Sequence, residues 1–139
     1  MSIFTSSTLV LRFAEQQVFL NRKLDQALSA HGISFTEFTA LRQLHIAPNK
    51  QIRRIDLAQL IGLSASGVTR LLNPMEKIGL VTKEASERDA RVSLVKLTES
   101  GERLLKEAEV SFDHLADRSL QDFTEHDCSE FARLISKIR

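Results

Sequence analysis

Two helical patterns joined by a tight turn, and followed at once by two strand-length runs, constrain the fold of residues 56–97 most strongly. The first helix is expected over residues 56–61 and ends at Gly62, since glycine suits the left-handed backbone of a helix terminus. Its buried side is expected to comprise Leu57, Ala58, Leu60 and Ile61. Ser64 then serves as the N-cap of a second helix over residues 65–78. This is helix-turn-helix spacing, a weak signal by itself because many helical proteins contain such corners.

The chain continues from this helix pair into a β-hairpin. Residues 80–85 (LVTKEA) and 92–97 (VSLVKL) have the length of strands and a partial alternation of apolar and polar side chains. The turn between them, residues 86–91, is polar apart from Ala90. A helix-turn-helix followed directly by a two-stranded hairpin predicts a winged helix, with the hairpin tip as the wing.

The helix over residues 65–78 has two distinct faces. Apolar side chains follow one helical stripe: Val68, Leu71, Leu72, Met75 and Ile78. The opposite face carries Ser66, Thr69, Arg70, Asn73 and Lys77. Short hydrogen-bonding side chains with an arginine suit the edges of base pairs, whereas a solvated face more often carries Glu and Lys pairs. An ordinary surface face remains the alternative for this helix alone, and Pro74 predicts a kink or a loosened second half beyond the residues that would contact DNA.

Helical patterns flank this part of the chain on both sides. A long helix is expected over residues 7–30, and Ser34 begins the next one with the S-x-x-E spacing of a capping box. That second helix stops before Pro48. Thr98 and Thr124 are expected to cap two C-terminal helices.

The predicted fold class is therefore mainly α with a small β-hairpin wing. A winged helix-turn-helix lobe is expected over residues 34–98. The long N- and C-terminal helices, residues 1–33 and 99–139, form a second helical region of the same compact chain.

Charge is unevenly distributed along the sequence. The net charge is only +1, but residues 50–98 hold nine basic and five acidic side chains. Residues 99–139 hold six basic and ten acidic ones. A basic middle segment favours nucleic acid as a partner, although such a segment also arises by chance.

The composition indicates a cytoplasmic protein. No apolar run approaches the roughly 18 residues that span a bilayer, and the N-terminus lacks the pattern of a secretory signal. The single cysteine, Cys128, cannot form an internal disulfide, which suits a reducing compartment. We expect no membrane partner, no cofactor and no metal, because the four histidines are scattered and form no ligand cluster.

The segment LAQLIGLSASGVTRLLNPMEKIGLV, followed by RDARVSLVKLTESG, resembles the MarR family of bacterial winged-helix transcription regulators. An Asp-x-Arg in the wing and a Leu-Thr-x-x-Gly at the following helix carry the resemblance, together with a Gly-Leu-Val after the second helix. These motifs are Asp89 and Arg91, then Leu97, Thr98 and Gly101, and Gly79-Leu80-Val81. Any one of them is weak, whereas the combination is specific.

The resemblance implies a homodimer whose N- and C-terminal helices intertwine and which sets two lobes on a pseudo-palindromic site in double-stranded DNA. One helix of each lobe would enter the major groove and the wing would reach the minor groove. The residues implied on the DNA face of that helix are Ser64, Ser66, Gly67, Thr69, Arg70 and Asn73. In the wing, Arg91 would enter the minor groove, Asp89 would brace it, and Arg88 would contact a phosphate.

Two positions depart from the family pattern. Arg53, beside Arg54, stands where members often have a capping Ser or Thr, so the short helix is poorly capped, but both arginines are candidates for phosphate contacts. Gly67 stands where many members have Ser or Thr, so one base contact is lost or replaced by a close backbone approach.

The resemblance also implies regulation. Repression is the usual role in the family, and a small aromatic or phenolic effector commonly binds between the dimer helices and the DNA-binding lobe. Arg42 and His45 are the candidate anion partners for such an effector.

Two alternatives remain open from the sequence, a redox-responsive regulator and a winged helix that binds protein. An enzyme is not expected, because the string His126-Asp127-Cys128 projects helical side chains about 100° apart and so forms no relay. A redox-responsive regulator acting through Cys128 is one alternative, tested by alkylation and by Cys128→Ser. A winged helix that binds protein rather than DNA is another.

Overall fold

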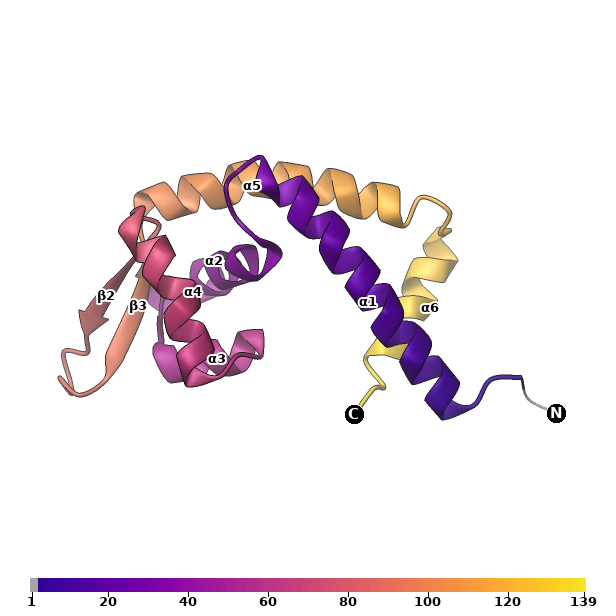
Figure 1. Ribbon diagram of the computed structural model, residues 1–139, viewed down its shortest axis with the longest axis horizontal. Helices are drawn as coiled ribbons and strands as arrows, with labels where there is room; N and C mark the ends of the chain where they lie inside the picture. Colours follow the sequence, from indigo (N-terminus) through magenta and orange to yellow (C-terminus); the bar gives the residue numbers. More distant parts are fainter. Residues whose placement is uncertain (1–2) are drawn as a thin grey trace.

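One long helix, α5 (Glu99–Ser119), links a winged-helix lobe at one end of the molecule to a helical arm at the other (Figure 1). The arm consists of α1 (Ser6–Ser29) and α6 (Glu125–Ile135). The computed structural model describes residues 3–139. The elements up to the second helix of the helix-turn-helix are α1 (Ser6–Ser29), α2 (Phe35–Ile46), a short 3-10 helix η1 (Pro48–Lys50), β1 (Gln51–Arg53), α3 (Arg54–Ile61) and α4 (Ala65–Lys77). They are followed by β2 (Val81–Ala85), β3 (Ser93–Leu97), α5 (Glu99–Ser119) and α6 (Glu125–Ile135).

Side-chain caps begin four of the helices at the predicted residues. Ser34 and Thr124 form capping boxes in which cap and third helical residue bond each other's backbone. Ser64 accepts from Gly67 N at the start of α4, and Thr98 caps α5. The cap of α3, Arg53, makes no such bond, as its residue type predicts.

The lobe is held together by an apolar core to which α5 contributes directly. Leu41, Leu57 and Leu72 from three different helices are fully buried in it. The rings of Phe38 on α2 and Phe112 on α5 stack with centroids 4.9 Å apart. Because α5 packs in this core and then continues to the arm, it joins the two ends of the molecule.

Two residues predicted to be buried are exposed. Leu60 is 56% exposed, because α3 is covered on the side of Leu57 and Ala58 and Leu60 projects well away from the middle of that side. Ile78 is 63% exposed, because α4 ends at Lys77 and the buried stripe therefore ends one turn earlier, at Met75.

A third strand completes the sheet behind the wing. β1 pairs antiparallel with β3, with Ile52 opposite Val95, so the strand order is β1-β3-β2. The sequence predicted only the β2–β3 hairpin, since three residues are too few to show an alternating pattern. Pro74 lies inside α4 without ending it, and the helix continues to Lys77.

Within residues 3–139, no helix has both the length and the apolar character needed to cross a membrane.

Candidate DNA-binding surface

The N-terminal end of α4 and the tip of the β2–β3 wing lie on the same side of the lobe, opposite α5 (Figure 1). We call this side the α4–wing face. It carries the exposed polar residues of α4, namely Ser64, Ser66, Arg70 and Asn73, and the exposed wing residues Arg88 and Arg91. Six of the eight sequence-predicted helix and wing residues are therefore exposed on these two elements, whereas Gly67 and Thr69 are half-buried.

Serine side chains at the start of α4 are engaged in the cap. Ser64 Oγ accepts from Gly67 N at 3.1 Å and lies 3.2 Å from Ser66 Oγ. A Cβ added at Gly67 would lie 3.2 Å from Ser64 Oγ, which is tighter than ordinary contact. The glycine therefore leaves room for the cap hydroxyl, a local reason for the departure from Ser or Thr at this position.

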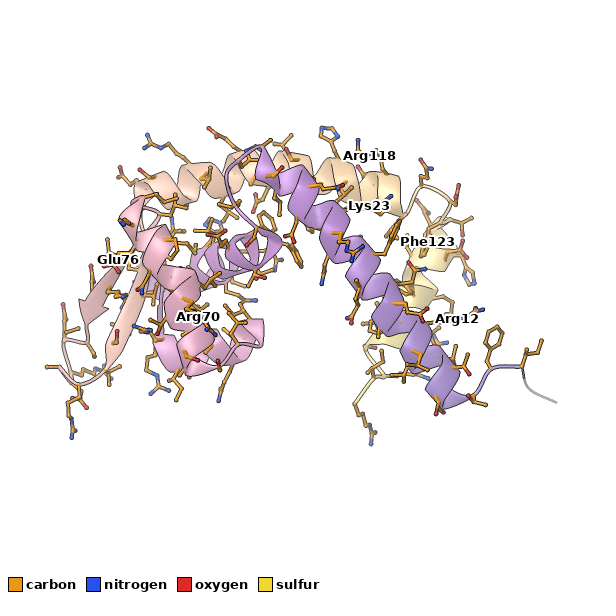
Figure 2. All side chains as sticks on the ribbon, viewed as in Figure 1. Arg12, Lys23, Arg70, Glu76, Arg118 and Phe123 are labelled. Carbon is orange, nitrogen blue, oxygen red and sulfur yellow. The ribbon has the colours of Figure 1, made fainter. Side chains whose placement is uncertain are left out.

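Arg70 is the exposed cation in the middle of the α4 face (Figure 2). Among residues 3–139 it forms no hydrogen bond or ion pair, so its five donors are available to a ligand. A guanidinium in this position can bind guanine in a bidentate manner.

Arg54, in contrast, is used within the lobe. Its guanidinium donates to Thr69 Oγ1, and the Thr69 hydroxyl donates to the backbone oxygen of Ala65 at 3.1 Å. This contact joins α3 to α4. Arg53 is exposed and pairs with Asp56 one turn later, at 2.8 Å and 3.2 Å.

The wing contains the predicted Asp-Arg pair. Arg91 Nε and Nη2 donate to the two carboxylate oxygens of Asp89 at 3.1 Å and 3.2 Å, and the Arg91 backbone N–H donates to Oδ1 at 3.0 Å. These bonds hold the guanidinium against the Asp89 carboxylate, and the arginine side chain is nevertheless 91% exposed. The arginine is therefore oriented and accessible at once.

The same hydrogen bonds from the Arg91 side chain and then from its backbone lower the pKa of the Asp89 carboxyl below its ordinary value. In Arg91→Ala we expect the pKa of Asp89 to rise toward that ordinary value, because the largest cause of its depression is removed. NMR titration of the side-chain carboxyl carbon measures it. An unchanged pKa of Asp89 in the variant would show that the pair does not form in solution.

The Leu-Thr-x-x-Gly motif joins the wing to α5. The Thr98 hydroxyl donates to the backbone oxygens of Gly79 and Leu80 at 2.6 Å and 3.0 Å, and accepts from Gly101 N at 3.0 Å. A Cβ at Gly101 would lie 2.2 Å from the Leu80 oxygen. The motif therefore ties the end of α4, the wing and the start of α5 into one corner, and does so from behind the α4–wing face.

Neither of the predicted effector residues, Arg42 and His45, lines the cleft that lies between α1 and α5. Arg42 is exposed on α2, while His45 Nδ1 lies 3.3 Å from Glu102 Oε1 without hydrogen-bond geometry. Lys50 Nζ donates to the same oxygen at 2.5 Å, and this bond is the main cause that lowers the pKa of Glu102. The neighbour of His45 is thus a carboxylate, which is unfavourable for binding a further anion.

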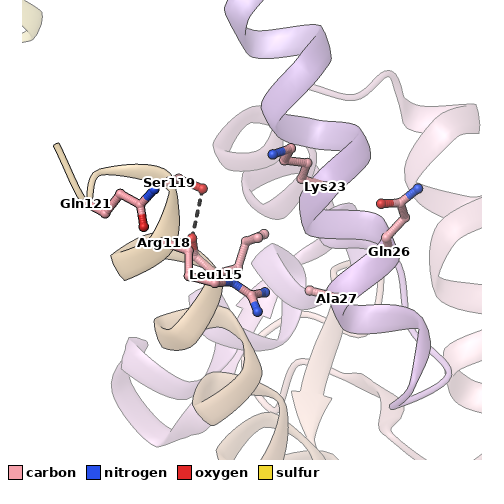
Figure 3. A pocket seen from close by; sticks show the side chains of 7 residues that line it. All are labelled: Lys23, Gln26, Ala27, Leu115, Arg118, Ser119 and Gln121. Carbon is pink, nitrogen blue, oxygen red and sulfur yellow. Dashed lines mark hydrogen bonds between the residues drawn. The ribbon is translucent and has the colours of Figure 1, made fainter.

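A cleft of about 530 Å³ lies elsewhere, between α1 and the C-terminal half of α5 (Figure 3). It is lined by Lys23, Gln26, Ala27, Leu115, Arg118, Ser119 and Gln121. The sequence did not single out these residues, because their proximity depends on how α1 crosses α5.

Lys83 on β2 was also missed by the sequence. Its ammonium donates to Asn73 Oδ1 at 3.0 Å and lies 3.2 Å from Glu76 Oε2, so the wing strand is connected to the exposed face of α4. A local sequence pattern cannot predict a contact between residues that lie ten positions apart on different elements.

Comparison with known proteins gives a family match over part of the chain and a fold over nearly all of it. Residues 31–92 match the sequence model of the MarR family. The chain superposes on Sco3205, a MarR family transcriptional regulator from Streptomyces coelicolor solved in complex with DNA, with a TM-score of 0.85, 22% identity and coverage of 96% of this chain and 89% of that one.

Two further solved structures are similar over nearly the whole chain. A MarR variant from E. coli, complexed with operator DNA, gives a TM-score of 0.85 at 21% identity and covers 99% of this chain and 98% of its own. A MarR family regulator from Rhodococcus sp. RHA1 gives 0.86 at 19% identity, covering 96% and 94%. At these identities the likeness establishes the winged-helix fold, including the long flanking helices.

Proposed function

We propose that the chain is a transcriptional regulator of the MarR family, whose sequence model matches residues 31–92, and that it binds a pseudo-palindromic DNA operator as a homodimer and represses the adjacent gene. The observation that carries the proposal is the α4–wing face, on which one lobe exposes an unpaired Arg70 and an Arg91 that Asp89 braces. An arginine on the helix suits guanine in the major groove, and an arginine on the wing suits the negative potential of a narrow minor groove.

Charge supports the same assignment. Residues 50–98, which include α4 and the wing, carry nine basic and five acidic side chains, while the acidic excess lies in residues 99–139. Cationic side chains gain affinity by releasing counterions from the phosphate backbone, so binding is expected to weaken as salt rises.

A gel-shift titration with DNA from upstream of the chain's own gene tests the proposal. We expect a discrete shifted band that unlabelled upstream DNA displaces at far lower concentration than coding-region DNA of equal length. Equal displacement by the two competitors would mean that the protein does not discriminate sequence, and the absence of a shift at low salt would argue for a protein-binding winged helix.

The homodimer in the proposal is supported by apolar side chains of α1 and α6 that remain exposed within residues 3–139. Leu134 is 50% exposed and Ile138 is 64% exposed, and α6 has no buried residue. Exposed apolar residues continue along α1 at Leu9, Val10, Leu11, Val18 and Phe19. An eleven-residue helix gains most of its stability from packing an apolar face, so a second copy of the arm is the partner that this surface fits.

Leu134→Glu is therefore expected to convert the protein to a monomer and to lower its thermal stability, because a carboxylate replaces an apolar side chain inside the proposed interface. Sedimentation velocity measures the change in mass. Ser129→Glu is the matched control, since it adds the same charge on the opposite side of α6. A Leu134→Glu protein that sediments as the wild type does would contradict the proposed interface.

Regulation by a small aromatic or phenolic anion is the remaining part of the proposal. The sequence suggested Arg42 and His45 as partners of this anion. The carboxylate of Glu102 lies beside His45 and would repel an anion there. Lys23 and Arg118 in the cleft between α1 and α5 offer two cations without a carboxylate among the lining residues. Release of operator DNA by such an anion, followed by gel shift, would support this part.

A further inference from the structure

Lys83 contacts two residues of α4 that lie one turn apart on its exposed side. Its ammonium nitrogen is 3.0 Å from Asn73 Oδ1 and 3.2 Å from Glu76 Oε2. The carboxylate and the ammonium attract each other, so Glu76 holds the lysine beside the amide of Asn73. Glu76 projects from the end of α4 nearest the sheet (Figure 2).

This arrangement fixes the orientation of the Asn73 amide. A lysine ammonium has three donors and no acceptor, so only the amide oxygen of Asn73 can face it. The amide nitrogen must then point away from Lys83. Asn73 is exposed, so that NH₂ group is free to donate to a ligand at the α4–wing face.

An asparagine with both ends of its amide free reads adenine, because its oxygen accepts from adenine N6 while its nitrogen donates to N7. Lys83 takes one of the two lone pairs of this oxygen and turns it toward β2, so the amide nitrogen is the end of Asn73 that is turned away from the lysine. Guanine presents two acceptors, O6 and N7, in the major groove, whereas adenine presents N7 alone and its N6 amino group would meet the Asn73 amide nitrogen donor to donor.

We infer that Lys83 is a specificity-determining positioning residue, which holds Asn73 as a hydrogen-bond donor and so makes it select guanine over adenine. This inference rests on the proposed binding of DNA through α4. Lys83 acts through Asn73 and needs no base contact of its own. The inference therefore predicts a preference for guanine over adenine at one base pair in each half-site.

The contact is too exposed to matter much for folding. The Lys83 and Glu76 side chains are 31% and 40% exposed, and ion pairs at such positions contribute little to stability. Replacing Lys83 with methionine keeps the unbranched stem and removes the donor. A stable, folded variant is therefore expected, and its sequence preference can be compared directly with that of the wild type.

Selection of bound sequences from a random DNA library, followed by sequencing, tests the inference. Asn73→Ala identifies the base pair that Asn73 reads, as the position where preference disappears. At that pair we expect Lys83→Met to raise the ratio of adenine to guanine about tenfold, because the bidentate adenine contact becomes available. Lys106→Met, which removes an exposed lysine from α5, away from the α4–wing face, should leave the ratio unchanged.

Repeating the comparison in a Glu76→Gln background removes the charge that Lys83→Met would leave unpaired. An adenine-to-guanine ratio that does not change in Lys83→Met, or weaker binding to all sequences without a change in preference, would overturn the inference. So would an Asn73→Ala variant that selects the same sequences as the wild type. If the wild type itself enriches no sequence, the proposed function fails first, and that result is distinct from the others.

Discussion

Replacing Arg91 with alanine is expected to weaken operator binding by about a hundredfold per dimer at fixed salt. The side chain is 91% exposed and already oriented by Asp89, so little rotamer freedom is lost when it enters the minor groove. Loss of one charge-assisted contact costs about 1.4 kcal/mol, a factor of ten, and a dimer has two wings that act independently. Fluorescence anisotropy with labelled operator measures the dissociation constant.

The fold should be unaffected by this change, because the only partner of Arg91 among residues 3–139 is Asp89 in the same turn. Lys106→Ala is the matched control, since it removes one exposed positive charge from α5, away from the α4–wing face. Binding by Arg91→Ala within a factor of two of the wild type would show that the wing does not contribute to recognition.

Gly101→Ala is expected to destabilise the protein by about 2 kcal/mol or more. A helical Gly→Ala change normally stabilises by about 1 kcal/mol, but here the new Cβ would lie 2.2 Å from the Leu80 backbone oxygen and 2.7 Å from Leu97 Cδ1. The backbone oxygen cannot move aside without breaking its bonds to Thr98. The corner formed by the end of α4, the wing and the start of α5 must therefore open.

Thermal unfolding at equal protein concentration measures this loss, since a dimer unfolds in a concentration-dependent way. Ser100→Ala at the neighbouring exposed position is the control and should change the stability by less than about 0.5 kcal/mol. A Gly101→Ala protein as stable as the wild type would show that the corner has more room than the structure indicates.

Features governed by neighbours in sequence were predicted correctly. The caps Ser34, Ser64, Thr98 and Thr124 depend on bonds across three residues, which a sequence displays directly. The pairing of Asp89 with Arg91 is local in the same way.

Features that depend on which element covers another were not predicted. Leu60 has the apolar character of a core residue, yet the packing of α3 leaves it exposed. The Arg54–Thr69 and Lys83–Asn73 contacts join residues on different elements, so only the folded chain brings them together. The motif glycine, Gly101, was noticed in the sequence, but the carbonyl of Leu80 that requires it becomes visible only in three dimensions.

Selection of genomic DNA fragments by the purified protein, followed by sequencing, tests the central claim most directly. The α4–wing face of a homodimer predicts that enriched fragments share a pseudo-palindrome with half-sites about one helical turn, roughly 10 base pairs, apart. Arg70→Ala should lose that enrichment. Fragments without a shared sequence, or equal enrichment of the same sequences by Arg70→Ala, would contradict sequence-specific binding through this face.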